Sequence, residues 1–316
     1  MGDIAKGVLG GGWALLVGWI LPTALNVAVF TLAVAPSLHR PTALDPLWPA
    51  SNGPTALLLL VAAVLLGLVL NALQTPLYRV LEGYALWPTA AYERGCRVQR
   101  SRHQRTVDRL ADPTFTSPIR RAILQEKFNR YPVSDKQITP TRLGNAIRRF
   151  EEYGYDRYRL DTQVLWNELA SSAPEPTTKQ VVTARTSVDF FVALLYGHAA
   201  VAVTAFASLS ASHAHRPVLV ITGVTLAVLT PAWYHGAVAA TDEWAAAVRA
   251  LVNLGRKPLA DGLGLVLPKS LEDERRMWQL VTRISTKSYA PAADTAFEPY
   301  RIDPTQASGE PPRPIS

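Results

Sequence analysis

Five polar residues stand at the ends of long apolar segments, where a side chain could bind an ion or line an aqueous path. They are Asn71, Arg185, Asp189, His235 and Asp242. Arg185 and Asp189 are four residues apart, a spacing that permits an ion pair on a helix. His235 and Asp242 are seven apart and therefore share one stripe of a helix. Such residues could line the inner mouth of a polar path, or they could be ordinary residues of the membrane boundary and of a solvated face.

A second group of polar residues lies in the middle of the chain. Its members are Arg142, Asn145, Glu151, Arg157 and Asp161. Basic and acidic side chains at these spacings can pair with one another on short packed helices. The group predicts either an internal network that stabilises the fold or a docking surface for a protein or ligand.

Motifs of well-known catalytic chemistry are missing. The sequence contains no G-x-x-x-x-G-K-[ST] phosphate loop, no G-x-S-x-G nucleophile motif and no H-E-x-x-H zinc motif. Cys96 is the only cysteine, which excludes an internal disulfide and a zinc site built from thiolates. His198 lacks a second histidine at matching depth, and we interpret it as a buried neutral side chain bonded to another helix. We predict no catalytic residue, no cofactor and no metal, and an enzyme is the least favoured class.

Four long apolar segments determine the class of the protein. They run from Val8 to Ala35, Thr55 to Leu73, Val188 to Leu209 and Pro217 to Tyr234. Each is close to or above the roughly 20 residues that a helix needs to cross the hydrocarbon of a bilayer. Asp189 is the only Asp, Glu, Lys or Arg in any of them, and none has the polar stripe of a soluble helix. The sequence predicts an all-α integral membrane protein with four transmembrane helices in two hairpins and a helical cytoplasmic domain.

The distribution of basic residues predicts the orientation in the membrane. Residues 75–186 hold 19 of the 32 Lys and Arg residues, and the segment after Val238 holds 10. Since loops rich in Lys and Arg stay in the cytoplasm, we expect a multi-pass protein of the cell (inner) membrane with both termini cytoplasmic. The same excess favours contact with anionic lipids of the inner leaflet. Nucleic-acid binding is less favoured, because topology alone produces this excess.

These features divide the chain into five regions. Residues 1–74 are expected to form the first transmembrane hairpin, 75–186 the cytoplasmic helical domain and 187–236 the second hairpin. Residues 237–288 are expected to form C-terminal cytoplasmic helices. Residues 289–316 are rich in Pro, Ala, Asp and Thr, and this composition predicts a disordered tail.

Local signals predict where several cytoplasmic helices begin and end. Thr141 is expected to cap a helix that Gly154 closes, and a further helix is expected over 156–170. Glycine and proline residues between 255 and 268 predict a loop, after which Ser270 caps the last helix.

Four stretches carry a resemblance to known proteins. They are Pro140–Asn145 (PTRLGN), Glu151–Tyr153 (EEY), Arg157–Asp161 (RYRLD) and Leu267–Trp278 (LPKSLEDERRMW). Their sequence and spacing resemble signatures of a family of bacterial, mostly actinobacterial, multi-pass membrane proteins. The resemblance implies a shared architecture from the second apolar segment onward. It implies no activity, because none is established for that family.

The favoured function is non-enzymatic: a multi-pass membrane protein that couples a cytoplasmic helical domain to the membrane through self-assembly or a cytosolic protein partner. The alternative is a homo-oligomeric channel or pore-forming effector, because four spans with so few polar residues cannot enclose a hydrophilic path alone. A transporter is less favoured, since the broken-helix repeats and midplane charges of that class are missing.

Overall fold

The computed structural model of the chain is helical. It describes residues 12–38, 52–112, 114, 117–212, 214–288 and 291–301. Within this part of the chain there is no β-sheet, and the only extended pairing is a bridge between Leu265 and Arg301. The prediction of an all-α protein is confirmed for the described residues.

Within the described residues, four helices are long and apolar enough to cross a membrane, as the sequence predicts. They occupy Gly12–Ser37, Gly53–Ala72, Glu175–Ser210 and Arg216–Gly262. The first combines two π turns, η1 (Leu16–Ile20) and η2 (Phe30–Val34), with α2 (Leu21–Val29) and the 3-10 turn η3 (Ala35–Ser37). The others are α3 (Asn52–Ala72), α10 (Glu175–Ala207) with the 3-10 turn η6 (Ser208–Ser210), and α11 (Arg216–Gly262).

The last two of these helices are longer than a bilayer requires. Helix α11 has 47 residues, which corresponds to about 70 Å at the usual rise per residue. The hydrocarbon of a bilayer is only about 30 Å thick. A membrane-spanning α11 would therefore continue as a helix well outside the hydrocarbon.

The chain divides into two compact units. The first contains Met1–Arg105, Thr139–Asn145 and Val182–Trp244, and the second contains Thr106–Ile138, Ala146–Val181 and Ala245–Ser316. Helices α10 and α11 each contribute residues to both units.

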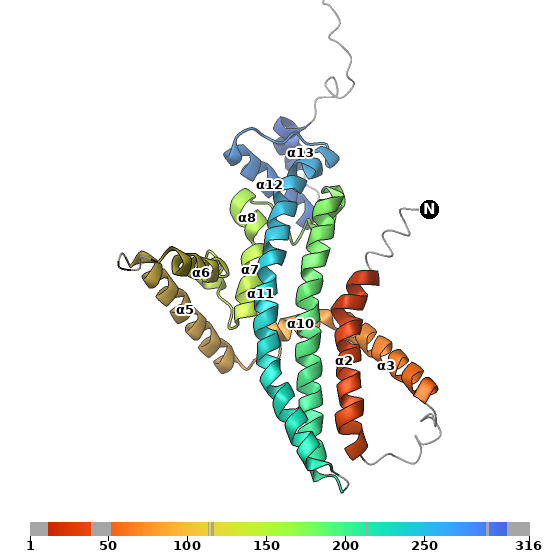
Figure 1. The fold of residues 1–316 in the computed structure, drawn as a ribbon. Coiled ribbons are helices and arrows are strands. Elements are labelled where there is room, and N and C mark those ends of the chain that lie inside the picture. Colours follow the sequence, from red (N-terminus) through yellow and green to blue (C-terminus); the bar gives the residue numbers. More distant parts are fainter. Residues whose placement is uncertain are drawn as a thin grey trace, which may run out of the picture. The chain divides into compact units, whose positions relative to one another are not determined.

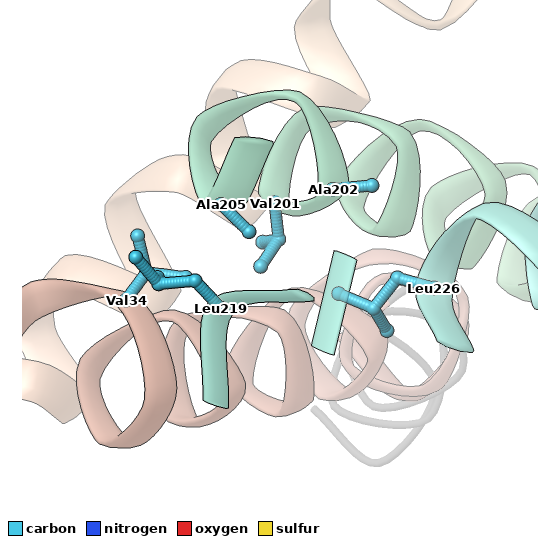
Figure 2. Close-up of a cluster of buried hydrophobic side chains, with 6 residues drawn as sticks. All are labelled: Val34, Val201, Ala202, Ala205, Leu219 and Leu226. Atoms are coloured by element: carbon cyan, nitrogen blue, oxygen red, sulfur yellow. The ribbon is translucent and has the colours of Figure 1, made fainter. Parts of the chain in front are cut away.

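An apolar cluster holds the first unit together where η2, α10 and α11 meet. Its buried members, labelled in Figure 2, are Val34, Val201, Ala202, Ala205, Leu219 and Leu226. In this unit α10 and α11 run side by side, with α2 beside α10 (Figure 1). The alanines on α10 allow the neighbouring backbones to approach closely, which is how membrane helices gain packing contacts. Helix α3 packs against α2 and leaves most of its apolar surface exposed.

The second span is followed by two helices. Helix α4 (Gln74–Glu82) ends at Gly83, and α5 (Thr89–Ala111) is the long arginine-rich helix. The second unit contains α6 (Pro118–Asn129) and the 3-10 turn η5 (Asp135–Gln137).

Two predictions about the following helices are wrong. Gly154 does not close a helix, because it lies inside α8 (Tyr153–Tyr158), directly after α7 (Arg142–Glu151). The helix expected over 156–170 is interrupted after residue 158, which ends α8, and resumes as α9 (Trp166–Ser172). Arg159 takes the left-handed conformation instead, with φ of 61°, and allows Leu160 N to donate to Gly154 O at 3.2 Å.

The loop expected over 255–268 begins later than predicted. Helix α11 continues through Gly255 and Pro258 to Gly262. The two residues after Pro258, Leu259 and Ala260, are fully buried, and this packing offsets the helix-breaking tendency of proline. The prediction that Ser270 caps the last long helix, α12 (Leu271–Thr286), is confirmed, since its Oγ accepts from Asp273 N at 3.1 Å.

The predicted disorder of residues 289–316 is wrong for part of that segment. Pro291–Phe297 form α13, which contacts α12, and Glu298–Tyr300 form the 3-10 turn η7. Phe297 is buried, and Tyr300 O accepts from Val266 N at 2.7 Å. The buried ring of Phe297 and this backbone hydrogen bond therefore order a polar stretch. Residues 302–316 lie outside the described residues.

Candidate functional site

A groove with a volume of about 560 Å³ lies in the first unit. Its walls come from the end of α4, the loop after it, α5, the segment before α7 and the middle of α11. Three basic side chains line it, Arg102, Arg142 and His235, together with the aromatic rings of Trp87 and Tyr234. The lining of the groove thus combines positive charge with apolar and aromatic surface.

Pro140 fixes one wall of this groove against α4 and α5. Gly83 has φ of 93°, a conformation that favours glycine, and a Cβ there would overlap the ring of Pro140. A Cβ at Gly95 would lie 2.5 Å from Pro140 Cβ. Gln99 Nε2 also donates to Pro140 O at 3.5 Å. Both glycines are therefore required for the proline ring to approach.

Asn145 holds the segment before α7 in shape. Its Nδ2 donates to Thr139 O at 3.1 Å and to Thr141 O at 2.7 Å, and its Oδ1 accepts from Thr139 N at 2.8 Å. Thr141 Oγ1 accepts from Gly144 N at 2.9 Å, so the prediction that Thr141 caps the helix is confirmed. Asn145 is buried, and these three hydrogen bonds stay within its own segment.

Tyr234 joins α11 to the first turn of α7. Its hydroxyl oxygen accepts from the backbone N–H groups of Arg142 and Leu143, at 3.1 and 3.2 Å. These N–H groups have no partner inside the helix, so the tyrosine satisfies both. The backbone of Arg142 is held while its side chain is exposed at the groove.

Asp189 forms a separate, buried polar cluster. Its Oδ1 accepts from the Tyr78 hydroxyl at 2.7 Å, and the Trp19 indole also donates to the carboxylate. Arg185 Nε lies 3.8 Å from Oδ2, which confirms the predicted ion pair. Burial, and then the nearby carboxylate, raise the pKa of Tyr78 well above its ordinary value. The phenol therefore stays protonated and remains a donor.

The other predicted residues of the inner-membrane set, Asn71, His235 and Asp242, lie on α3 and α11. His235 lines the groove, and Asp242 is half-buried one stripe position further along α11. Asn71 is half-buried on α3, three residues before Gln74, whose Oε1 accepts from Arg185 at 2.8 Å. Asp189 is 7% exposed and meets the side chains of Tyr78, Trp19 and Arg185.

The second predicted set is divided between the two units. Arg142 and Asn145 belong to the first unit, and Glu151, Arg157 and Asp161 to the second. Asp161 Oδ1 accepts from the backbone of Gln163 and Val164, and Arg157 O accepts from Arg275 at 2.7 Å.

Glu151 and its neighbour Glu152 share one arginine. Arg148 lies 3.8 Å from the carboxylate of Glu151 and 2.7 Å from that of Glu152. Burial raises the pKa of both glutamates above the ordinary range, although Arg148 opposes the shift. Arg148 thus pairs with both glutamates on neighbouring turns of the chain.

The second unit also contains an ion pair with a buried carboxylate, which the sequence analysis missed. Arg256 Nη1 donates to both oxygens of Glu274, at 2.6 and 2.5 Å, and Trp278 Nε1 donates to Oε1 at 3.2 Å. The Arg256 guanidinium also stacks on the ring of Tyr158, 4.4 Å from its centroid. The signal was present, since Glu274 and Trp278 belong to the LPKSLEDERRMW stretch, but nothing identified Arg256 as their partner.

His198 is buried on α10 and meets α11 through its ring. It packs edge-on against Trp233, with ring centroids 5.7 Å apart. The predicted bond to another helix is absent, because its backbone partner, Leu194, is on its own helix. Across the part of the chain that the structure describes, no three His, Cys, Asp or Glu side chains are placed to hold a metal ion.

Comparison with protein-family models, with curated proteins and with solved structures finds no match to this chain. Its function must be inferred from its own residues and geometry.

Proposed function

We propose that this protein is a multi-pass protein of the inner membrane that couples a cytoplasmic helical domain to its spans. Its four apolar helices would form two hairpins with both termini in the cytoplasm, as the distribution of basic residues favours. It would act by assembling with copies of itself or with a cytosolic protein. The observation that carries this proposal is that α10 and α11 are unbroken helices longer than a bilayer requires.

Both parts of α11 are anchored by packing. Leu219 and Leu226 are buried in the apolar cluster of the first unit. Leu251 and Val252, further along the same helix, are fully buried and belong to the second unit. Because one continuous helix takes part in both cores, a change in the packing of either core acts on the same helix.

Helix α3 offers the surface on which copies could assemble. Only 11% of the most apolar part of this span is buried, against 44% for Glu175–Ser210. Such a surface faces lipid or another apolar helix, and association in a membrane depends on packing of this kind.

Breaking α11 tests the coupling. Two glycines inserted after Trp244 interrupt the helix where its residues pass from one unit to the other. We expect this variant to insert in the membrane at normal levels but to fail to restore the phenotype of a deletion strain. The matched control places the same two glycines after Ala211, in the turn before α11, and should restore it. Full function of the Trp244 insertion would rule out coupling through α11.

The second candidate function is a homo-oligomeric pore, which the exposed face of α3 also permits. The protein mass of the detergent-solubilised complex distinguishes the two. A ring-sized oligomer favours the pore, and a monomer or dimer leaves too few spans for a polar path. Asp189 is buried within one chain. If the variant Asp189→Asn conducted as well as the wild type, Asp189 would not belong to the pore lining.

A further inference from the structure

We propose that the groove lined by Arg102, Arg142 and His235 binds the phosphate headgroup of an anionic phospholipid from the inner leaflet. This site deepens the proposed function and rests on its membrane topology. The proposal assigns the lipid to one defined binding site. General attraction of lipids to a basic surface would not require such a site.

The charge of the groove fits a phosphodiester. None of the side chains that line it is acidic, while α5, α7 and α11 each contribute one basic or imidazole side chain. The planar guanidinium of arginine presents paired donors that match phosphate oxygens. Both arginines are exposed residues that line the groove.

The first turn of α7 adds to this field. Its amide groups at Arg142 and Leu143 are already bonded to the Tyr234 hydroxyl, so they do not need the ligand as a partner. The peptide dipoles of the helix still make this end positive. A headgroup seated beside Arg142 would therefore be attracted by the side chain and by the helix end.

The apolar part of the lining distinguishes a lipid from a soluble phosphate. Val80 and Leu81 at the end of α4 line the groove together with Trp87. In the loop that carries Trp87, Tyr84 is 51% exposed and Leu86 is 89% exposed. Exposed aromatic and aliphatic side chains directly after a span are typical of the membrane interface. Acyl chains could lie on this surface while the phosphate meets the arginines.

The groove is also large enough for a headgroup. Its volume of about 560 Å³ falls within the range of ordinary small-molecule sites, roughly 300–1,000 Å³. Its walls are fixed by Pro140 and by Tyr234, so the site is formed before a ligand arrives.

The experiment measures lipid binding to the full-length protein in detergent. Short-chain phosphatidylglycerol is titrated against the wild type and the double variant R102Q/R142Q, and short-chain phosphatidylcholine and glycerol phosphate are titrated in parallel. We expect phosphatidylglycerol to bind the wild type, and the double variant to bind it at least about tenfold more weakly, which corresponds to the loss of charge-assisted contacts.

The matched control is R105Q/R109Q, which removes the same charge from exposed positions of α5 that do not line the groove. It should bind within about twofold of the wild type. An equal loss in the control would show general attraction to a basic surface and overturn the site. Equal affinity for glycerol phosphate, or for phosphatidylcholine, would also overturn it.

Two checks distinguish loss of the lipid site from misfolding of the variant and from failure of the proposed coupling. Unfolding temperature and membrane insertion of the double variant are compared with the wild type, and the single variant R142Q replaces it if either falls. Loss of lipid binding leaves the coupling through α11 standing, because the glycine insertions do not touch the groove. Failure of the wild type to insert in a membrane would remove both proposals.

Discussion

Each of the two units buries one carboxylate beside an arginine, and the two are satisfied differently. Asp189 in the first unit is 7% exposed, and its close partners are neutral, the Tyr78 hydroxyl and the Trp19 indole. Glu274 in the second unit is 4% exposed and has its arginine within 2.6 Å of both oxygens.

The arginines differ in exposure as well. The side chain of Arg185 is 45% exposed and its nitrogen is 3.8 Å from Asp189, whereas that of Arg256 is 26% exposed. The comparison indicates that a buried carboxylate can be stabilised either by a cation or by neutral hydrogen-bond donors. Removing the cation should therefore be severe in the second unit and mild in the first.

The largest effect is expected from Arg256→Met. It leaves the buried Glu274 carboxylate without a cation, which typically costs about 3–5 kcal/mol of unfolding free energy. Denaturant unfolding of the full-length protein in detergent, followed by tryptophan fluorescence, measures the loss. The double variant R256M/E274M should recover most of it, because both charges are then absent. A single variant within about 1 kcal/mol of the wild type would contradict the comparison.

Tyr78→Phe should have the next largest effect. It removes the hydroxyl donor from buried Asp189 and should cost about 1–3 kcal/mol, the penalty of an unsatisfied buried acceptor. The same unfolding assay measures it. Tyr155→Phe is the control, since Tyr155 is exposed, and surface changes of this kind stay within about 0.5 kcal/mol. Equal losses in the two variants would mean that the hydroxyl of Tyr78 contributes nothing specific.

Arg185→Gln should be milder. Arg185 is 45% exposed and 3.8 Å from the carboxylate, so we expect a cost near the roughly 0–1 kcal/mol of ion pairs with a solvated cation. Tyr78 and Trp19 still donate to Asp189. The loss should also shrink as salt is raised, because exposed charges are screened. A cost comparable to that of Arg256→Met would show that Asp189 depends on the cation after all.

The smallest effect concerns pH and Glu152. Burial raises the pKa of Glu152 in the folded state, so the folded protein holds this proton more tightly than the unfolded chain. Its contribution to stability is present at low pH and is lost as pH rises from about 4 through the raised pKa. The unfolding temperatures of the wild type and Glu152→Gln are compared across this range. As pH increases, the unfolding temperature of the mutant should rise relative to that of the wild type. If the unfolding temperature of the wild type instead rose relative to that of the mutant, the prediction would be wrong.

Sequence reasoning was accurate where the signal was local. The Arg185–Asp189 pair, the cap at Thr141 and the cap at Ser270 each depend on residues three or four apart, and all are confirmed. It failed where a distant core outweighed a local signal. Helix α11 passes Pro258 because Leu259 and Ala260, the two residues after it, are buried, and Phe297 orders a segment whose composition predicts disorder.

The sequence by itself determined the helical class and the four apolar helices, because span length and the absence of charge are properties of contiguous residues. Only the tertiary structure decided which polar residues meet. Tyr78 reaches Asp189 from 111 positions away, and Tyr234 reaches Arg142 from 92. It placed Arg142 and His235, taken from two separately predicted sets, in one groove. Such contacts depend on how helices pack, and no spacing along the chain encodes that geometry.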